Sequence, residues 1–533
     1  MIMKFAKLAK KGICAFLATA MVAGTISGCS GQDGEGKLVK ISVCVSNQTP
    51  AAKALEEVLK PMIEEKTDGK YNIQIYNSGV LGSEKVTYDY TRNGIIEMCV
   101  IGTPMWSETP KMAIPDKGNF IVHTKDIKKG WSEPVWIDQG GIDPSLLFDD
   151  DGTVYFLSTA TDEQGEAGIF MCEINPFTGE KLTESVVISR GCGGRYAEGP
   201  HLYKWFGKYY LMLAEGGTEY GHMETMLRSD CPYGPYEACP HNPILTHRDD
   251  MREEIYCTGH ADMMEDHNGN WWMVCLAIRP CEEKSNRVLL HNLGRETFLA
   301  PVVWDEEGWP VVGDKGLISL EMDGPLPGPE PGKVNRDFSD DFSDETFSTS
   351  YNFLRNPNME HYKRDTGNAA LVLQGTEITL NDMDSPTWLG IRQKGFETVS
   401  SVEVCLLEAE NNVRAGLTAF YTESYHYEIY ITRENGVSKV CLAKHIHDIY
   451  VVTAEKEISD AENIILRVES DKKYYRFAFS VDGKVFTELG TGLVVGLCTE
   501  GTKYMTFTGT YIGMFAENGI ARFKNFKINV KDY

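Results

Sequence analysis

The stretch that decides the fold is EGPHLYKWFGKYY at residues 198–210, because two other segments repeat its pattern. DPSLLFDDDGTVYF occupies residues 143–156, and HADMMEDHNGNWW occupies residues 260–272. In each copy a polar residue stands nine positions before a turn glycine, and an aromatic pair follows that glycine. The three leading residues are Asp143, Glu198 and His260. This repeat predicts three hairpins of similar construction.

The spacing of the hairpins points to a β-propeller. Successive leading residues are 55 and 62 positions apart. A hairpin that recurs about every 40–50 residues, or at slightly longer intervals, is typical of a propeller. Each blade of a propeller is a small antiparallel sheet. If the blades are equivalent, the leading residues share one position at the start of an innermost strand. We therefore expect Asp143, Glu198 and His260 to converge on one pocket beside the central axis.

Two carboxylates and an imidazole next to aromatic side chains suit the cleavage of a glycosidic bond. One protonated acid supplies a proton to the leaving oxygen, and one carboxylate activates water or attacks the sugar. Trp271 is placed to stack on a sugar face. Each leading residue alone also fits a turn or capping role. Their shared register favours the catalytic interpretation.

The hairpin motifs resemble glycoside hydrolase family 43, in particular its β-xylosidases with a C-terminal sandwich. The resemblance runs from about residue 118 to 533 and includes EGGTEYGH at 215–222, GRETFL at 294–299 and SPTWLGIRQ at 385–393. It implies a five-bladed propeller that hydrolyses β-xylosyl or α-arabinofuranosyl bonds with inversion. Pocket shape decides between the two sugars, and the sequence leaves that choice open.

The resemblance also implies roles for individual residues. Glu198 would be the general acid, and Asp143 would orient it and keep its pKa raised through like charge. Arg295 would bind sugar hydroxyls from the pocket floor. His260 would hold an ordered water near the axis or, in some relatives, a calcium ion, and no other cofactor is implied. The further substrate-binding residues are His222 and, lent by the sandwich domain, Phe507.

One departure from the family pattern concerns the general base. In the family it is an aspartate in a Pro-Asp-Pro motif on the first blade, and no such motif precedes Asp143. Asp116 follows a proline, but Lys117 comes next. We expect the first blade and much of the second to be missing, which leaves sheet edges and core faces open. Because a general base contributes about 10²–10⁴-fold, we expect turnover to be poor or absent.

The residues before this region resemble a different family. Residues 55–70, 76–84 and 92–98 are similar to the start of a TRAP-type transporter solute-binding lipoprotein. This similarity ends near Asp116, before the second lobe and the arginine that clamps a carboxylate ligand. We interpret the chain as two fragments joined near residue 117, by rearrangement or faulty sequence assembly, with a natural fusion as the alternative. The alternative functions are capture of organic acids for import and non-catalytic carbohydrate binding.

The N-terminal segment reads as an export signal. Four lysines precede an apolar stretch at residues 13–26, which is too short to span a bilayer comfortably. The stretch leads into ISGC at residues 26–29, which resembles a lipobox ending at Cys29. An ordinary secretory signal is the alternative. We expect an exported protein, lipid-anchored at the bacterial cell surface or periplasmic face through Cys29.

Charge and cysteine content narrow the classes of partner. A net charge of −25, from 77 acidic and 52 basic residues, disfavours nucleic acid, which attracts clustered lysine and arginine. We expect xylo- or arabino-oligosaccharides as ligands, and membrane contact only through the N-terminal lipid. The oligomeric state stays open. The 14 cysteines show no zinc-site spacing, which predicts buried free thiols.

Together these observations predict a mainly β chain. An incomplete five-bladed propeller and a concanavalin-like β-sandwich would follow a short α/β fragment. Four prolines among glycines between residues 325 and 331 indicate a stiff linker. The expected divisions are a signal peptide at 1–29, the α/β fragment at 30–117, the partial propeller at 118–322, the linker at 323–335 and the sandwich at 336–533.

Overall fold

The computed structural model describes most of the chain from residue 119 onward and parts of the segment before it. The described ranges are residues 37–43, 55–67, 70–76, 98–100, 119–127, 129–249, 254–281, 290–325, 334–407, 412–459, 464–502 and 505–532. The chain divides into two compact units, residues 1–107 and 108–533.

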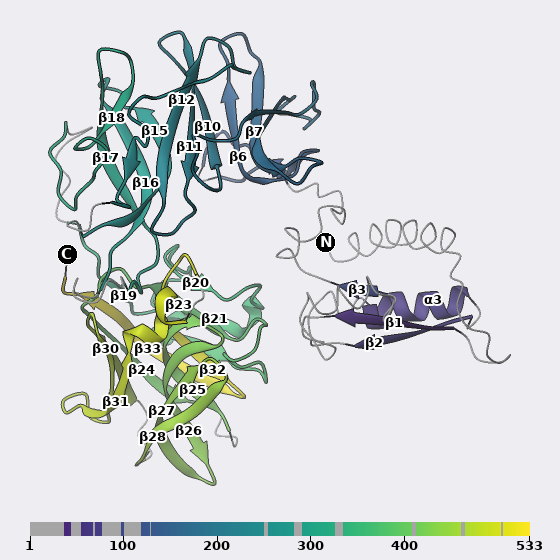
Figure 1. The fold of residues 1–533 in the computed structure, drawn as a ribbon. Helices are drawn as coiled ribbons and strands as arrows, with labels where there is room; N and C mark the ends of the chain where they lie inside the picture. The colour runs from purple at the N-terminus through teal and green to yellow at the C-terminus, as the bar shows by residue number, and fades with distance from the viewer. Residues whose placement is uncertain are drawn as a thin grey trace. The chain divides into compact units, whose positions relative to one another are not determined.

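The first unit contains a parallel sheet with the order β2-β1-β3 (Figure 1). Its strands are β1 (Lys37–Val43), β2 (Tyr71–Tyr76) and β3 (Met98–Val100). A helical segment, η1 (Leu55–Leu59) followed by α3 (Lys60–Lys66), connects β1 to β2, as a parallel pair requires. Its apolar side packs on the sheet through Leu59 and Ile63 against Ile41 and Ile73. The α/β character predicted for this segment is confirmed. The lipobox Cys29 lies outside the described residues.

The second unit begins with antiparallel sheets that carry the sequence repeat. Sheet one has the order β6-β7-β8-β9, sheet two β10-β11-β12-β13 with β14 on β12, and sheet three β15-β16-β17-β18. Their strands are β6 (Ile142–Phe148), β7 (Val154–Thr161), β8 (Ala167–Glu173), β9 (Val186–Ser189), β10 (Glu198–Trp205), β11 (Lys208–Glu215), β12 (Met223–Ser229), β13 (Glu237–Ala238), β14 (Leu245–Thr246), β15 (Tyr256–Glu265), β16 (Trp271–Ile278), β17 (Glu296–Trp304) and β18 (Pro310–Val312).

Each predicted hairpin forms the first two strands of one sheet. The turn glycines Gly152, Gly207 and Gly269 have φ values of 90°, 76° and 83°, which a side chain would make unfavourable. The strands β6, β10 and β15 that carry the leading residues each lie at one end of their sheet order. This placement confirms that the three leading residues belong to equivalent strands.

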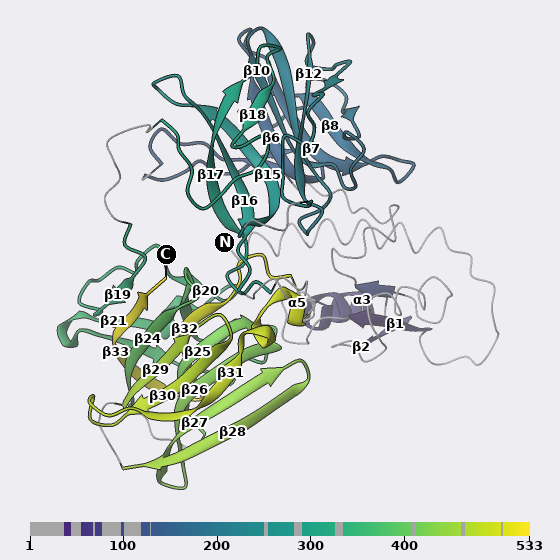
Figure 2. The same ribbon diagram turned by 60° about the vertical axis from the view of Figure 1, so that its left-hand side comes forward.

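Successive sheets pack face to face through buried side chains. Leu157 and Met171 of sheet one meet Leu202 and Leu211 of sheet two in one cluster. A second cluster joins sheet two to sheet three. Burial on both faces explains why strands such as β7, β11 and β16 have nearly continuous apolar runs. The views in Figures 1 and 2 show the three sheets side by side, coloured from blue to teal. This arrangement is the predicted propeller type of fold.

A two-stranded sheet, β4 (Asn119–Ile121) and β5 (Val135–Ile137), precedes sheet one. Ile121 and Ile137 on one of its faces pack against sheet one. On the other face Phe120 and Trp136 are 50% and 49% exposed, with ring centroids 5.1 Å apart. Among the residues described between 108 and 325, this small sheet and the three larger ones are the only sheets. An open aromatic face agrees with an incomplete propeller, and the count of five blades stays a prediction.

Residues after the proline-rich segment form a sandwich of two antiparallel sheets. The first has the order β21-β22-β33-β24-β29-β30-β31 with β19 on β33, and the second has the order β20-β23-β32-β25-β26-β27-β28. The strands are β19 (Phe338–Asp340), β20 (Asn352–Phe353), β21 (Tyr362–Asp365), β22 (Ala370–Gln374), β23 (Trp388–Arg392), β24 (Thr398–Leu406), β25 (Arg414–Thr422), β26 (Tyr425–Glu434), β27 (Val437–Ile446), β28 (Ile449–Ile458), β29 (Ile464–Ser470), β30 (Tyr474–Ser480), β31 (Thr487–Leu493), β32 (Tyr511–Glu517) and β33 (Ile520–Val530). Most of the predicted linker lies outside the described residues.

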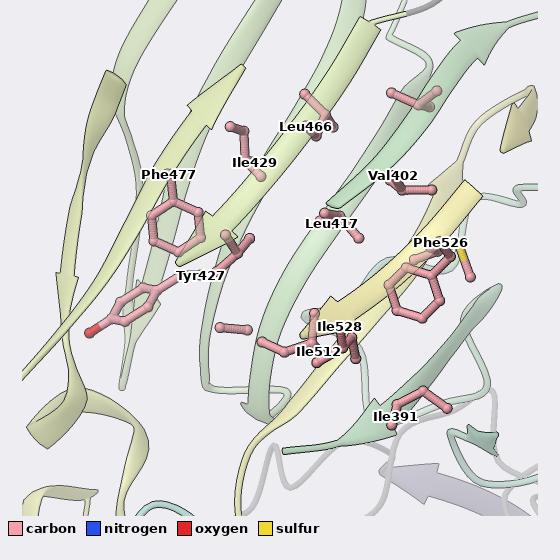
Figure 3. Close-up of a cluster of buried hydrophobic side chains, with 14 of the residues drawn as sticks. Ile391, Val402, Leu417, Tyr427, Ile429, Leu466, Phe477, Ile512, Phe526 and Ile528 are labelled. Atoms are coloured by element: carbon pink, nitrogen blue, oxygen red, sulfur yellow. The ribbon is translucent and has the colours of Figure 1, made fainter. Parts of the chain in front are cut away.

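The sandwich core lies between these two sheets (Figure 3). Leu417 and Ile512 extend from the second sheet, and Leu466 and Phe477 extend from the first. All four are fully buried. Alternation along β24 and β29, with every second residue buried, is what a strand with one core face requires. The predicted all-β C-terminal domain is confirmed.

Ten cysteines within the described ranges are free thiols, and most of them are buried. This agrees with the prediction that they act as small apolar core residues. No helix within those ranges is long and apolar enough to cross a membrane.

Candidate active site

Asp143 and His260 meet at irregularities in the first strands of sheets one and three. An oxygen of the Asp143 carboxylate, Oδ2, lies 3.5 Å from Nε2 of His260. The same oxygen accepts a hydrogen bond of 3.0 Å from the backbone N–H of Gly199, which belongs to sheet two. Asp143 therefore joins three sheets at one point. The contact expected between Asp143 and His260 is present, whereas a common pocket for Asp143, Glu198 and His260 stays a prediction.

A bulge at the start of each first strand creates this meeting point. The pairing register shifts between Ile142 and Ser145, between Glu198 and His201, and between Gly259 and Asp262. Inside these bulges the φ values of Asp143, Gly199 and His260 are 51°, 59° and 48°. Bulges bend a strand and redirect a side chain, and they are common beside active sites.

The bulges correct one detail of the predicted register of the three repeated segments. Asp143 and His260 occupy the same structural position, but its counterpart in sheet two is Gly199, and Glu198 lies one residue earlier. Five residues separate the paired Phe148 and Val154 in the first hairpin, whereas two separate Trp205 and Lys208 in the second. The paired stretch of β10 is correspondingly longer by one residue. Equal spacing to the turn glycine therefore does not mean equal position in the strand.

The pKa values of the two carboxylates move in opposite directions. Burial raises the pKa of Glu198, and the nearby Asp143 charge raises it further, against the opposing charges of His260 and Arg295. Burial also acts to raise the pKa of Asp143, but the hydrogen bond and charge of His260 and the Gly199 N–H lower it overall. Asp143 therefore stays an anion while Glu198 is biased toward its protonated form. Such a divided pair can supply one proton donor and one fixed negative charge.

His260 contributes most to the lowered pKa of Asp143, against the opposing effect of burial. Its hydrogen bond to Asp143 raises the pKa of the imidazole, although burial opposes the shift. A Cβ atom added at Gly199 would lie 3.1 Å from the His260 ring, so the glycine permits this close approach. The described residues contain no group of three or more His, Cys, Asp or Glu side chains placed to hold a metal ion. We therefore assign no step to the calcium ion that the resemblance allowed.

Arg295 and Phe507 join the propeller to the sandwich beside these carboxylates. The guanidinium of Arg295 lies 3.9 Å from the ring centroid of Phe507. The backbone N–H of Arg295 donates to the carbonyl of Phe507 at 2.7 Å, and its Nη1 donates to the Thr218 hydroxyl at 2.9 Å. The sequence had placed Arg295 and Phe507 at the site, and the structure brings them into contact. Thr218 was missed, although it lies inside the quoted stretch 215–222.

His222 lies behind the site rather than on its surface. Its ring is fully buried, and Nδ1 lies 2.9 Å from the carbonyl oxygen of Cys257. Nε2 has no hydrogen-bond partner among the described residues. Burial lowers the pKa of the imidazole to about 4, so it is neutral at physiological pH. The buried ring does not reach the described surface of the site. Its contact with sugar therefore has no support in this structure and stays a prediction.

A pocket of about 130 Å³ lies between the propeller and the sandwich. Its lining includes Thr218, Tyr220, His291, Arg295, Glu500 and Phe507. Glu500 Oε1 accepts hydrogen bonds from the Tyr220 hydroxyl at 3.1 Å and from Nδ1 of His291 at 2.7 Å. Its other oxygen accepts the backbone N–H of His291 at 3.1 Å. Sequence reasoning did not find this group, because its members lie more than 200 residues apart.

The described groups that act on the Glu198 charge are Asp143, His260 and Arg295. No third carboxylate is among them. Two carboxylates whose pKa values shift in opposite directions and a guanidinium lie on the propeller, with an aromatic ring from the sandwich beside them, and these are groups that glycosidase chemistry uses.

Comparison with known proteins agrees with this class. Residues 102–310 match the family model for Glycosyl hydrolases family 43, and residues 339–529 match the Beta xylosidase C-terminal Concanavalin A-like domain. A non-reducing end alpha-L-arabinofuranosidase, BoGH43B of Bacteroides ovatus, is 36% identical over 407 residues, which are 76% of this chain and 74% of that protein. The chain belongs to glycosyl hydrolase family 43 and is a glycosidase.

Other relatives give the same result. A xylosidase/arabinosidase of Butyrivibrio fibrisolvens is 31% identical over 75% of this chain and 78% of its own length. Among solved structures, the Bacteroides ovatus Xyloglucan PUL GH43B has a TM-score of 0.71 at 35% identity, covering 77% of this chain and 80% of that one. The Bacillus licheniformis GH43 protein BlXynB has a TM-score of 0.70 at 30% identity, covering 77% and 79%.

The N-terminal part matches a different family. Residues 41–139 match the model for Bacterial extracellular solute-binding protein, family 7. The predicted resemblance of this part to a solute-binding protein is confirmed. The two family matches overlap between residues 102 and 139. The junction expected near residue 117 falls within this overlap, and its position stays a prediction.

Proposed function

We propose that the chain acts on terminal β-xylosyl or α-arabinofuranosyl residues of hemicellulose-derived oligosaccharides, with inversion and with impaired turnover. The observation that supports this chemistry is that the pKa values of the carboxylates Asp143 and Glu198 shift in opposite directions. Burial and Asp143 raise the pKa of Glu198, which keeps a proton available for the leaving oxygen. The names of two similar proteins, an arabinofuranosidase and a xylosidase/arabinosidase, support the choice of sugars.

In this mechanism the exocyclic bond between the anomeric carbon and the leaving oxygen breaks as Glu198 donates its proton to that oxygen. Asp143 stays ionised beside His260 and opposes early loss of the proton from Glu198. Arg295, held by Thr218 and stacked on Phe507, presents its guanidinium to sugar hydroxyls. A water oxygen attacks the anomeric carbon from the opposite face, and a base must accept its proton.

The proposed impairment concerns this last proton. Asp143 is the one carboxylate among the causes of the raised pKa of Glu198, and no Pro-Asp-Pro motif precedes Asp143 from which a base could be assigned. The chain covers 74% and 78% of the two relatives, which leaves about a quarter of each unmatched. Both observations support a missing first blade. The expected loss is about 10²–10⁴-fold, the usual contribution of a general base.

Xylobiose hydrolysis, with and without sodium azide, tests the proposal. Azide needs no deprotonation, so it should replace the activated water and raise turnover of the natural chain. Glu198→Gln should remove both the basal and the azide-dependent activity, because the leaving alcohol of xylobiose requires a proton. Glu163→Gln, which changes an exposed carboxylate on the same propeller, is the matched control. Full activity without azide would refute the impairment, and azide-dependent turnover by Glu198→Gln would refute the role of the acid.

We further propose that the protein is exported and anchored by a lipid on Cys29. The support is the lysine-rich start, the short apolar stretch and the lipobox-like residues 26–29. Radiolabelled palmitate should be incorporated by the natural chain in a bacterial host and not by Cys29→Ala. Equal labelling of both would refute the anchor.

The match of residues 41–139 to a solute-binding family supports a second candidate function, capture of an organic acid. Before residue 108 the described part of this segment is a three-stranded sheet with one helical connection, and after it the segment contains β4 and β5, which pack on sheet one. Calorimetric titration of the full chain with succinate distinguishes the candidates. Saturable succinate binding that survives in Glu198→Gln would favour the solute-binding function.

A further inference from the structure

Tyr196 is an exposed aromatic residue two positions before Glu198. Its side chain is 65% exposed, which is unusual for a ring so close to a candidate catalytic acid. Its φ of 56° places it in the left-handed region, which bulky residues rarely adopt. Strained backbone of this kind persists only where the surrounding structure holds it, and it gathers at functional sites.

The loop that presents Tyr196 is held by a buried carboxylate. Glu215, at the end of β11, is fully buried. Its Oε1 accepts the backbone N–H of Cys192 at 2.7 Å, and its Oε2 accepts the backbone N–H of Gly194 at 2.6 Å. The hydroxyl of Thr225 donates to the same carboxylate at 2.7 Å. These bonds hold the backbone at Cys192 and Gly194, and the Tyr196 ring in the same loop is exposed.

The ring also has defined neighbours along the edge of the site. A Cβ atom added at Gly217 would lie 3.3 Å from a ring carbon of Tyr196, so the ring rests on the loop that begins there. The next residue of that loop, Thr218, binds the Arg295 guanidinium. The Arg195 guanidinium lies 5.4 Å from the Tyr196 ring centroid. Tyr196 is therefore linked through the loop at Gly217 and Thr218 to Arg295, whose charge acts on Glu198.

We propose that Tyr196 is a specificity-determining residue that stacks on the sugar of the leaving group. This inference rests on the proposed function. Glu198 must reach the leaving oxygen, so the sugar attached to that oxygen lies next to Glu198 on the side open to solvent. An exposed, rigidly held ring at this place offers its face to the C–H groups of that sugar. The residue would favour oligosaccharides over single sugars, because only the former extend past Glu198.

Calorimetric titration of the full chain with D-xylose and with xylotriose tests this. Tyr196→Ala should weaken xylotriose binding about tenfold and leave xylose binding unchanged, since stacking on the ring is lost only for the longer ligand. Tyr196→Phe keeps the ring and should bind xylotriose within about twofold of the natural chain. Phe177→Ala, which removes an exposed ring elsewhere on the propeller, should bind both sugars unchanged.

Three results would overturn the inference. Equal xylotriose affinity of Tyr196→Ala and the natural chain would show that the ring makes no contact. A parallel loss of xylose affinity would place its effect in the inner site, and a loss as large in Tyr196→Phe would implicate the hydroxyl instead of stacking. Failure of the proposed function looks different, because the natural chain itself would then bind neither xylose nor xylotriose.

Discussion

Glu500→Ala should loosen the attachment of the sandwich to the propeller at the wall of the site. The carboxylate accepts three hydrogen bonds from the propeller, two from His291 and one from Tyr220. The side chains of Glu500 and His291 are 13% and 10% exposed, so water replaces these bonds poorly. Seven residues after Glu500, Phe507 stacks on Arg295 and accepts its backbone N–H. The sandwich therefore contacts the propeller at two neighbouring places, through Glu500 and through Phe507.

The expected magnitude follows from these bonds. A hydrogen bond to a charged group contributes about 1.5–3 kcal/mol. Bonds that share one carboxylate are not additive, so we expect a total loss of about 3–4 kcal/mol in the free energy of unfolding. The matched control is Glu488→Ala in β31 of the same domain, where the side chain is exposed. That change should cost about 0.5 kcal/mol or less.

Two measurements check the prediction. Urea unfolding followed by tryptophan fluorescence gives the loss of stability. Native-state hydrogen exchange at the Arg295 amide, which is bonded to the Phe507 carbonyl, reports the local effect. We expect Glu500→Ala to accelerate this exchange and Glu488→Ala to leave it unchanged. A stability loss under about 1 kcal/mol, or unchanged exchange at Arg295, would refute the reasoning.

Other changes test the core, the ion pair and the bulge. Phe477→Ala, at a fully buried position, should cost about 3–5 kcal/mol in urea unfolding, whereas Phe177→Ala, at a 76% exposed position, should cost about 0.5 kcal/mol or less. The stability difference between the natural chain and His260→Ala, followed over pH, should be greatest between pH 3.8 and 6.5. The pKa of His260 is raised above 6.5, so its contribution is complete below 6.5 and is lost as pH rises through the folded value. The pKa of Asp143 is lowered below 3.8, so its contribution is present above 3.8 and is lost as pH falls through the folded value. Gly199→Ala, at a φ of 59° and with its Cβ 3.1 Å from His260, should destabilise the chain by about 1–3 kcal/mol, and no destabilisation would contradict the strain argument.

Most of the fold could be predicted because its signals are local. Glycines after aspartate or asparagine mark the turns of two hairpins, and the apolar runs on both sides identify the strands. Alternating apolar residues likewise mark strands of the sandwich such as β24 and β29. The packing of β4–β5 on sheet one depends instead on contacts across the chain. Short elements of three residues carry too little pattern to be recognised alone.

The site was predictable to the extent that its residues sit at the starts of repeated strands. Asp143 and His260 do meet, as the repeat implied. The sequence could not show that Glu198 lies one residue before the position of Asp143 and His260. The second hairpin has a shorter turn and a longer paired stretch, so its leading residue keeps the same distance to the turn glycine. The contact of Glu500 with His291 leaves no local trace either, since each residue belongs to a loop whose partner lies in another domain.

The arrangement of the groups around Glu198 separates its proposed acid role from the proposed loss of the base. Asp143 comes from sheet one, His260 from sheet three, and Arg295 from the segment that the sandwich holds. None of these elements belongs to the region proposed to be missing, so the neighbours that shift the pKa of Glu198 do not depend on that proposal. A chain of this kind should still protonate a leaving oxygen and fail only at the activation of water. Azide therefore distinguishes a site that is incomplete on one face of the sugar from a site that has collapsed.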